Sequence, residues 1–458
     1  MTTLKIEGAR FIVTIGPDRR ILQDGSILIE GQKITKVGKA SELADVPADR
    51  VIDANEMVIT PGFTNGHMHI SYAHATRGIF PDNLGREYLP NVFKLQAEMT
   101  EEEEYYTSLL AITELLKYGT TCWIDPGSTK YLDACMQAYK DSGCRIIVGW
   151  QVADRPNPLN LPVYTTEEAT TLMEQTVRTY DRRLDGRVRA WTMPFSAGFA
   201  SDELILTAKR LADQYNTSMT LHHVVSPEAV DASMKSYGKR PTEHLEDIGA
   251  LGPNVVLAHA LGINEAELDA IVRTQTNLVM CPTAAIKGGM GTSTRGLLPE
   301  MVEKGINVGI GTDAGNNSNL AETMRAMYLV AVLYKDGRQD VTMIPAETAL
   351  ELATLGGAKA FSLGDEIGSI EVGKKADLVL FDTRRVEWRT LFNPVNQLVY
   401  NADGRSVHTV IVDGRVVVEN HLPLFVNEWE LIQKVQEIGE DMLKRTGTPF
   451  PKHNWPLV

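Results

Sequence analysis

The segment from residue 58 to residue 69 reads VITPGFTNGHMH. Its first part, Val58–Asn65, is a largely apolar run without charged residues, which predicts a buried β-strand. His67 and His69 follow this run directly. Because side chains two residues apart on an extended chain point to the same side, we expect both imidazoles to face together at the end of the strand.

Seven further apolar runs follow, and helical stretches separate them. The strand-like runs are Thr120–Asp125, Arg145–Trp150, Val188–Pro194, Met219–Val224, Val255–His259, Leu278–Cys281 and Val308–Asp313. The clearest amphipathic stretches are Glu101–Tyr118, Thr165–Arg183, Asp202–Tyr215 and Glu265–Thr274. Eight strands that alternate with helices favour an α/β fold of the (β/α)8 barrel type over an open doubly wound sheet. No Gly-x-Gly-x-x-Gly follows the first strand, which also disfavours a dinucleotide-binding sheet.

Both ends of the chain are rich in short β-type runs. These are Leu4–Ile6, Phe11–Ile15, Ser26–Glu30, Lys33–Val37, Ala376–Asp382 and Thr409–Val418, the last with a turn at Asp413-Gly414. They predict a small β-sandwich built from the N- and C-terminal segments. We therefore expect a first part of the sandwich over residues 1–56, the barrel over 57–365, the second part over 366–425, and a C-terminal helix and tail over 426–458.

Composition limits the function classes. The 458 residues carry 45 Lys+Arg against 59 Asp+Glu, a net charge of −14, which argues against nucleic acid or an anionic membrane as partner. The four cysteines show no Cys-x-x-Cys spacing, and neither a secretory signal nor a transmembrane run is apparent. A cytoplasmic protein with a small-molecule substrate is expected.

Polar residues at strand ends suggest a metal site. In a barrel of this type the active site lies at the carboxyl ends of the strands. The fifth strand carries His222-His223, the sixth ends at His259, and the eighth ends at Asp313. Together with the histidine pair on the first strand, they would form a mixed nitrogen and oxygen ligand set for a metal ion.

The chain resembles the amidohydrolase superfamily, and within it the cytosine-deaminase-like branch that includes triazine hydrolases and phenylurea and thiocarbamate hydrolases. The resemblance covers nearly the whole length. The motifs that carry it are PGFTNGHMH (61–69), YGTT (118–121), LAH (257–259), CPT (281–283), GTD (311–313), ATLGGA (353–358), IGSIEVGKKAD (367–377) and VDG (412–414). It implies a barrel with a β-sandwich assembled from both termini.

The resemblance also implies roles for the polar residues. His67, His69, the histidine of strand five and Asp313 would hold one divalent ion per chain, with His259 as ligand or hydrogen-bond donor. Zinc is the first choice, and cobalt, iron or manganese are alternatives. Asp313 would take a proton from a metal-activated water, and His259 would stabilise the developing oxyanion.

The ligand of strand five depends on the register. Matching from the preceding helix selects His222, whereas matching backward from residues 237–241 selects His223. We favour His222, because an insertion is easier in a loop than in a strand.

Two departures from the deaminase pattern bear on the substrate. Deaminase relatives carry a Glu three residues after the strand-five histidine, where this chain has Val225 or Ser226, and Glu228 lies nearby. After Cys-Pro-Thr, Ala284-Ala285 replaces Ser-Asn. These losses favour hydrolysis of the C–N bond of a neutral amide, urea or carbamate. The resemblance to phenylurea and thiocarbamate hydrolases implies the activated C–S bond of a thiocarbamate as a further target, and a part in xenobiotic degradation.

Two other functions remain open. One is an aminohydrolase or dechlorinating hydrolase of an N-heteroaromatic ring, with Glu228 or a water chain in place of the lost Glu. The other is an inactive relative that serves as a binding or structural protein. Candidate substrate-lining aromatics are Phe80, Trp123, Trp150, Phe195 and Phe199, and His74 lies in the loop over the site. Relatives of this kind are commonly dimers or larger, so a homo-oligomer is expected.

Overall fold

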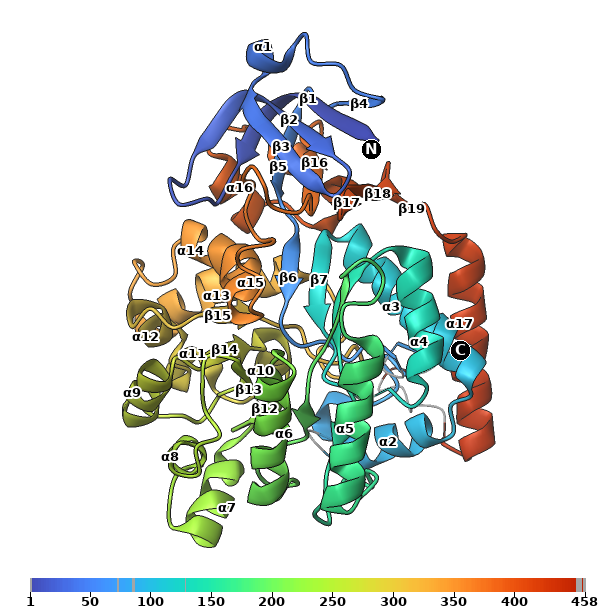
Figure 1. Ribbon diagram of the computed structural model, residues 1–458, viewed down its shortest axis with the longest axis vertical. Helices are drawn as coiled ribbons and strands as arrows, with labels where there is room; N and C mark the ends of the chain where they lie inside the picture. Colours follow the sequence, from blue (N-terminus) through green and yellow to red (C-terminus); the bar gives the residue numbers. More distant parts are fainter. Residues whose placement is uncertain (1, 72–73, 85–86, 128, 450–454, 456–458) are drawn as a thin grey trace.

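The computed structural model describes residues 2–71, 74–84, 87–127, 129–449 and 455. Figure 1 shows a β-rich region at the top of the view and, below it, a larger region in which strands are surrounded by helices. The N-terminal strands in blue and the C-terminal strands in orange-red share the upper region. Segments from both ends of the chain therefore build one structural unit.

The lower region contains parallel strands. They are β6 (Phe63–Asn65), β7 (Thr120–Ile124), β8 (Arg145–Val148), β9 (Gln151–Val152), β10 (Val188–Ala190), β11 (Met193–Pro194), β12 (Met219–His223), β13 (Val255–His259), β14 (Asn277–Met280) and β15 (Val308–Ile310). One ladder runs β10-β8-β7-β6, another runs β12-β13-β14-β15, and a short one joins β11 to β9. Every pairing among them is parallel, which confirms the predicted α/β class.

Further contacts connect the ladders to one another. Parallel bridges join Thr192 to Met219 and Ser196 to His222, so the β10–β11 segment lies beside β12. At the other side, the Gly66 N–H donates to the Ile310 carbonyl at 2.8 Å and the Asp313 N–H donates to the His67 carbonyl at 2.8 Å. The segment of the eighth strand therefore lies beside that of the first.

Helices lie between these strands in the chain. They are α2 (Leu89–Ala97), α3 (Glu101–Lys117), α4 (Leu132–Ser142), α5 (Thr166–Tyr180), α6 (Asp202–Gln214), α7 (Pro227–Tyr237), α8 (Pro241–Asp247), α9 (Glu265–Thr274), α10 (Pro282–Lys287), α11 (Thr292–Arg295), α12 (Leu298–Glu303), α13 (Thr323–Arg338), α14 (Ala346–Glu351), the π-helical η2 (Leu352–Gly356) and α15 (Gly357–Ala360). Capping boxes begin several of them: Thr100 with Glu103, Thr165 with Glu168, and Asn264 with Glu267. The sequence therefore marks where α3, α5 and α9 begin.

The upper region is one continuous sheet. Its strands are β1 (Thr3–Val13), β2 (Ile21–Glu30), β3 (Lys33–Lys39), β4 (Arg50–Asp53), β5 (Met57–Pro61), β16 (Leu378–Asp382), β17 (Val407–Val412), β18 (Arg415–Glu419) and β19 (Leu422–Pro423). The order is β19-β18-β17-β16-β5-β1-β2-β3, with β4 paired to β1. A β-rich domain built from both termini is thus confirmed, and its strands join edge to edge in a single sheet. The short elements α1 (Ala40–Leu43), η1 (Asp82–Leu84), η3 (Val386–Trp388), α16 (Pro394–Tyr400) and η4 (Gly404–Ser406) complete the inventory.

The predicted strand Val58–Asn65 is two strands in the structure. β5 pairs with β16 in the terminal sheet, whereas β6 pairs with β7 in the parallel region. The chain passes between the regions at Gly62, whose N–H donates to the Asp377 carbonyl at 2.8 Å. A side chain at position 62 would collide with Thr121, so only glycine fits this crossing. The first parallel strand therefore begins at Phe63, and the predicted start of the barrel at residue 57 is too early because Met57–Pro61 pairs within the terminal sheet.

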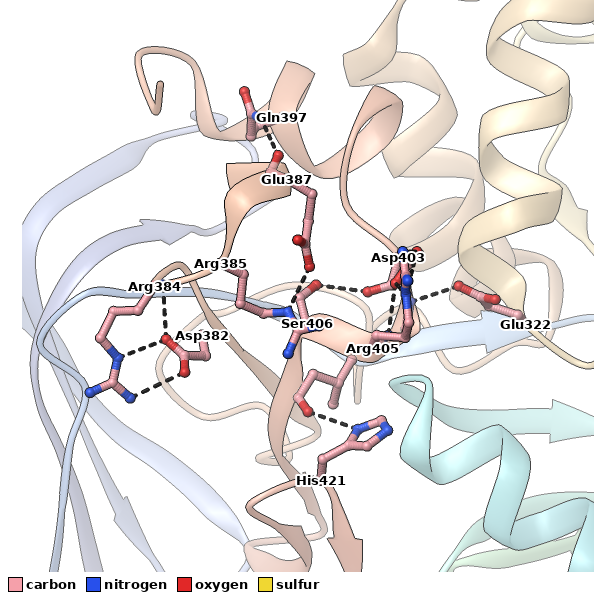
Figure 2. A network of polar contacts seen from close by, with 12 residues as sticks. Glu322, Asp382, Arg384, Arg385, Glu387, Gln397, Asp403, Arg405, Ser406 and His421 are labelled. Atoms are coloured by element: carbon pink, nitrogen blue, oxygen red, sulfur yellow. Dashed lines mark hydrogen bonds and ion pairs between the residues drawn. The ribbon is translucent and has the colours of Figure 1, made fainter. Parts of the chain in front are cut away.

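Buried polar contacts connect the two regions. Arg145, at the start of β8, is 2% exposed and donates to both carboxylate oxygens of Asp377, at 2.8 and 2.9 Å. It also donates to Asp413, in the turn before β18, at 3.1 Å. Figure 2 shows a second junction, where Glu322 before α13 faces the loop that contains Asp403 and Arg405. There the Glu322 carboxylate accepts a hydrogen bond from the Gly404 N–H at 2.7 Å.

The C-terminal helix α17 (Glu428–Thr446) lies in the segment 426–458, where a helix and tail were expected, and it packs along α3. Arg445 donates to both carboxylate oxygens of Glu103, at 2.6 and 2.9 Å. Figure 1 shows α17 along the side of the parallel region, next to α3 and α4. Among the helices of the described residues, none combines the length and apolar character needed to cross a membrane.

Candidate active site

The structure brings five of the predicted residues together at the carboxyl ends of the parallel strands. His67 and His69 follow β6, His222 lies in β12, His259 ends β13, and Asp313 follows β15. All are buried except His222, which is half-buried. Ligand atoms of His67, His222 and His259 lie within 4.8 Å of one another, and so do those of His67, His69 and Asp313. Residues up to 246 positions apart in the chain therefore share one small volume.

His67 stands at the centre of the cluster. Its ring centroid lies 4.9 Å from that of His69, 4.8 Å from that of His222 and 4.8 Å from that of His259. Asp313 Oδ1 lies 3.8 Å from His67 Nε2 and 3.6 Å from His69 Nε2. The Asp313 carboxylate thus lies beside His67 and His69, the two histidines that follow the first parallel strand.

The two adjacent histidines of β12 point in opposite directions. His222 Nδ1 lies 3.0 Å from the carbonyl oxygen of Phe195. A carbonyl can only accept, so Nδ1 carries the hydrogen and the lone pair of the ring is on Nε2. His223 Nε2 instead lies 2.9 Å from Thr242 Oγ1 in α8, and burial lowers the pKa of His223 to about 4. The structure therefore places His222 in the cluster and His223 against the helix.

The electrostatics favour the protonation states that bind a cation. Burial, then the neighbouring His222, His259 and His69, lower the pKa of His67 well below its ordinary value. Burial also lowers the pKa of His69 to about 4, although Asp313 opposes this shift. For Asp313, burial by itself raises the pKa, but His259, His69 and the Ala314 N–H together lower it. At neutral pH His67 and His69 are therefore neutral and the Asp313 carboxylate is ionised, as metal ligands must be.

The residues fit a divalent cation. In the part of the chain that the structure describes, neither ring nitrogen of His67 has a hydrogen-bond partner, although both are buried. A buried nitrogen without a partner is costly, and a cation at the centre of the cluster would remove that cost. Four imidazoles and one carboxylate form a donor set that suits zinc and other first-row divalent ions.

The backbone is strained where two of these residues sit. His259 has φ 80° and Asp313 has φ 62°, both in the left-handed region that residues with a Cβ rarely adopt. Such conformations cost about 1–3 kcal/mol each and persist only where the surroundings enforce them. Gly311 allows β15 to approach closely, because a Cβ there would lie 3.0 Å from the Cβ of His67. The chain after β15 therefore lies in close contact with His67.

Two of the predicted aromatic residues lie beside the cluster. The ring of Phe195 stacks on His222, with centroids 4.7 Å apart and planes inclined by 20°. Phe199 lies 5.0 Å from Phe195. These two half-buried phenylalanines form an apolar wall next to His222. Phe80 instead pairs with Tyr88 at 5.5 Å and packs against a separate apolar cluster that includes α2, α17 and Ala314.

Trp123 is not at the site. It is 0% exposed and belongs to the core that contains Leu109 of α3 and Cys135 of α4. Its neighbours Cys122 and Ile124 belong to a different cluster with Cys281 of the seventh strand segment. Because successive strand residues face opposite sides, Trp123 faces the helices, and the prediction that it binds substrate is wrong. Trp150 packs against the same core, with its Nε1 3.5 Å from the hydroxyl of Tyr164.

In the sequence, no carboxylate replaces the Glu that deaminase relatives carry three residues after the strand-five histidine. Val225 follows the strand and is half-buried, while Ser226 begins α7. Glu228 is solvent-exposed in the first turn of α7. The position three residues after His222 is therefore apolar.

Sequence reasoning missed two groups near the site. One is a partly buried pair of Glu114 in α3 and Arg77, in which Glu114 also lies 3.4 Å from Nε2 of His74, the loop histidine already named from the sequence. The other is Asn317, whose Nδ2 donates to Asp313 Oδ2 at 2.8 Å. No local pattern marks Glu114, because it occupies an ordinary helical position. The signal for Asn317 was its place four residues after Asp313, on the same strand-end loop.

Comparisons with known proteins identify the family of the chain. A sequence profile described as the amidohydrolase family matches residues 58–417. A 5-methylthioadenosine/S-adenosylhomocysteine deaminase from Syntrophobacter fumaroxidans is 30% identical over 430 residues, 93% of this chain and 96% of the relative. A 5'-deoxyadenosine deaminase from Methanosarcina acetivorans is 30% identical over 439 residues, 95% of this chain and 97% of the relative.

Solved structures share the fold. An adenosine deaminase from Xanthomonas campestris with bound zinc aligns with a TM-score of 0.86 and 26% identity, over 98% of this chain and 99% of that one. An atrazine chlorohydrolase from Arthrobacter aurescens, complexed with zinc, aligns with a TM-score of 0.85 and 22% identity, over 95% of this chain and 100% of that one. The second likeness concerns the fold alone.

Proposed function

Because the chain belongs to the amidohydrolase family, and so is a hydrolase of carbon–nitrogen bonds, we propose that it removes an amino group from an N-heteroaromatic ring with the help of one bound divalent ion. The observation that carries the proposal is the buried cluster of four histidines and Asp313. The relatives named as deaminases, which align over more than nine-tenths of the chain, favour ring deamination over the neutral-amide hydrolysis expected from the sequence. Membership in the narrower triazine and phenylurea branch stays a prediction.

In this proposal His67, His69, His222 and Asp313 hold the ion, and His259 is a further ligand or a hydrogen-bond donor. A divalent ion, with zinc as first choice, supplies Lewis acidity and makes water a stronger nucleophile at neutral pH. The choice of zinc is supported by the adenosine deaminase with bound zinc, which aligns over 98% of this chain. The donor set accepts other ions as well, so cobalt, iron and manganese remain alternatives.

The chain's own groups have distinct tasks. Asp313, ionised at neutral pH, accepts a proton from the attacking water and can pass it toward the leaving amine. His259 donates a hydrogen bond to the charge that develops on the substrate. Phe195 and Phe199, beside His222, offer flat apolar surfaces on which a planar heterocycle can stack.

A second candidate is the hydrolysis of a neutral amide, urea or (thio)carbamate. It is favoured by Val225, which occupies the position where deaminase relatives carry a proton-transferring Glu, and by Ala284-Ala285 after β14. An apolar surface at these positions suits a substrate that needs no ring protonation.

The two candidates differ in their products. We would load the purified protein with zinc and incubate it with 5'-deoxyadenosine, methylthioadenosine, aminated pyrimidines and triazines, phenylureas and thiocarbamates. Ammonia release with a ring product one mass unit heavier supports the proposal. Cleavage of ureas or thiocarbamates without ring deamination would replace it with the second candidate. Asp313→Asn serves as the inactive control.

A substitution at Val225 tests the missing acid. Val225→Glu should increase ammonia release from an aminated ring about 10-fold or more, because a positioned acid typically contributes at least that much. Val225→Gln is the matched control, since it has nearly the same shape but cannot transfer a proton. Equal rates for the Glu and Gln variants would show that another group already performs this transfer.

The proposal extends to the architecture. We take the parallel strands from β6 to β15 to form a closed (β/α)8 barrel within the expected range 57–365. The β-rich domain comprises 1–56, β5 (Met57–Pro61) and 366–425, and a C-terminal helix and tail follow over 426–458. The hydrogen bonds between the segments of the first and eighth strands support closure. The cytoplasmic location, the homo-oligomeric state and a part in xenobiotic degradation stay predictions.

A further inference from the structure

The two carboxylate oxygens of Asp313 have separate partners. Oδ1 accepts from the Ala314 N–H at 2.7 Å and is the oxygen nearest to the ring nitrogens of His67 and His69. Oδ2 accepts from Nδ2 of Asn317 at 2.8 Å. One oxygen is therefore directed toward the histidines while a side-chain amide holds the other.

We propose that Asn317 is a positioning residue that orients the carboxylate of Asp313 for metal binding. The inference rests on the proposed function, because it takes the cluster of His67 and its neighbours to be a metal site. The terminal torsion of an aspartate is broad, so the plane of the carboxylate can turn over a wide range, and because the two oxygens are chemically equivalent it is this plane that has to be fixed. A donor fixed against Oδ2 selects the orientation in which Oδ1 faces the histidines.

Asn317 is itself held on both sides. Its N–H donates to the Ala314 carbonyl at 2.9 Å, which closes the turn after Asp313. Its carbonyl oxygen accepts from Nζ of Lys287, the last residue of α10, at 3.0 Å. These main-chain contacts fix the backbone of Asn317 to the loop after β15 and to the helix after β14, and so fix the place from which its side-chain amide reaches Asp313 before any ion binds. Such preorganisation is what a precise ligand geometry requires.

The ion pair between Lys287 and Asp82 adds little to the anchoring of Asn317. Lys287 Nζ also lies 3.5 Å from the carboxylate of Asp82, but the Asp82 side chain is 84% exposed. Ion pairs this exposed are weak. Asn317 therefore depends mainly on Lys287 and on its own turn.

Loss of the Asn317 amide would leave Oδ2 of a buried carboxylate without this donor, since Asp313 is 8% exposed. The carboxylate would then rotate to find another donor and would present Oδ1 less often to the ion. Removal of a group that supports a metal ligand typically weakens metal affinity or activity by about 10–100-fold. We expect Asn317→Ala to weaken zinc binding by about that factor, and Asn317→Asp to do so too, because it keeps the shape but replaces the donor with an acceptor.

The test measures the zinc dissociation constant of the full-length protein by competition with a chromophoric chelator. Asn254→Ala is the matched control: Asn254 also donates from Nδ2 to an aspartate, Asp213 Oδ1 at 2.9 Å, but it lies before β13, at the end of the strand remote from His259. Its zinc affinity should equal that of the wild type. On the best substrate of the panel, the Asn317 variants should lose kcat with KM unchanged, because Asn317 contacts Asp313 and not the substrate.

The outcomes distinguish the positioning role of Asn317 from the proposed metal-dependent function. If the folded Asn317→Ala and Asn317→Asp proteins bind zinc within about two-fold of the wild type, the positioning role is wrong and the proposed function stands. A wild type that binds no zinc overturns both. Weaker zinc binding in Asn254→Ala of the same size would also overturn the role, because the effect would not be specific to Asp313. Thermal melts establish that each variant is folded.

Discussion

At the scale of single residues, His222 and His223 show how one position along a strand changes the task of a side chain. Both are histidines in β12, but successive strand residues face opposite sides of a sheet. His222 meets the rings of His67 and His259, whereas His223 meets Thr242 in α8. The same imidazole is a candidate ligand in one place and a packing and hydrogen-bonding group in the next.

Alanine substitutions should separate these tasks. We expect His222→Ala to lose most of the bound metal, because it removes one of the four proposed imidazoles at the site. His223→Ala should keep the metal but lower the free energy of unfolding by about 2 kcal/mol, since it leaves a cavity and an unpaired Thr242 hydroxyl in the core. Metal content by ICP-MS and urea unfolding provide the two readouts. Metal loss confined to His223→Ala would reverse the assignment.

At the scale of elements, Glu114 connects α3 to the loops around the site. Its carboxylate pairs with Arg77 and lies 3.4 Å from His74 Nε2, both in the segment after His69. It also accepts from the Ala321 N–H, just before α13, at 3.4 Å. Burial by itself raises the pKa of Glu114, but His74 and Arg77 lower it to about 2. One helix side chain thus fastens the loops that follow β6 and β15.

This contact should make stability depend on pH in the acid range. The pKa of Glu114 is about 2 in the folded chain against an ordinary value of 4.5, so the carboxylate stabilises the fold above pH 4.5 and loses this effect as the pH falls toward 2. Urea unfolding should show Glu114→Gln less stable than the wild type by about 3 kcal/mol at pH 7, with the gap narrowing toward pH 2. Glu167→Gln, at an exposed position of α5, should follow the wild type throughout. A gap for Glu114→Gln that is constant with pH would contradict this account.

At the scale of the whole molecule, a buried ionic cluster joins the parallel region to the terminal sheet. Arg145 belongs to β8, while Asp377 and Asp413 belong to the second part of the β-rich region. Lys375 lies 3.2 Å from Asp413 and adds a second cation. The Arg145, Asp377 and Asp413 side chains are at most 2% exposed, so each charge depends on the others for compensation.

Removal of the central charge should destabilise the molecule strongly. We expect Arg145→Met to reduce the free energy of unfolding by about 3–5 kcal/mol, because it leaves two buried carboxylates with less compensation. The control is Arg405→Met, which breaks the Arg405–Asp403 pair visible in Figure 2. Arg405 is 70% exposed, so this loss should stay below about 1 kcal/mol. Urea unfolding of both variants measures the difference, and equal losses would refute the structural role of Arg145.

Much of the fold was predictable because it rests on local patterns. Helix α9 and strand β13 have the predicted bounds, since a cap or an apolar run marks their ends. The break between β5 and β6 was not predictable, because the run Val58–Asn65 is continuous in character and only its two different partners divide it.

The candidate site likewise has one part that the sequence predicted and another that only the folded chain reveals. The sequence was enough to propose His67, His69, His259 and Asp313 and to favour His222 over His223, because each stands at a strand end and the ends of parallel strands meet at one edge. Only the folded chain shows that Phe195 stacks on His222 while Trp123 faces the helices, and that Glu114 and Asn317 support the loops. These contacts join residues from different loops and helices, and their distances are set by how the elements pack rather than by any pattern along the chain.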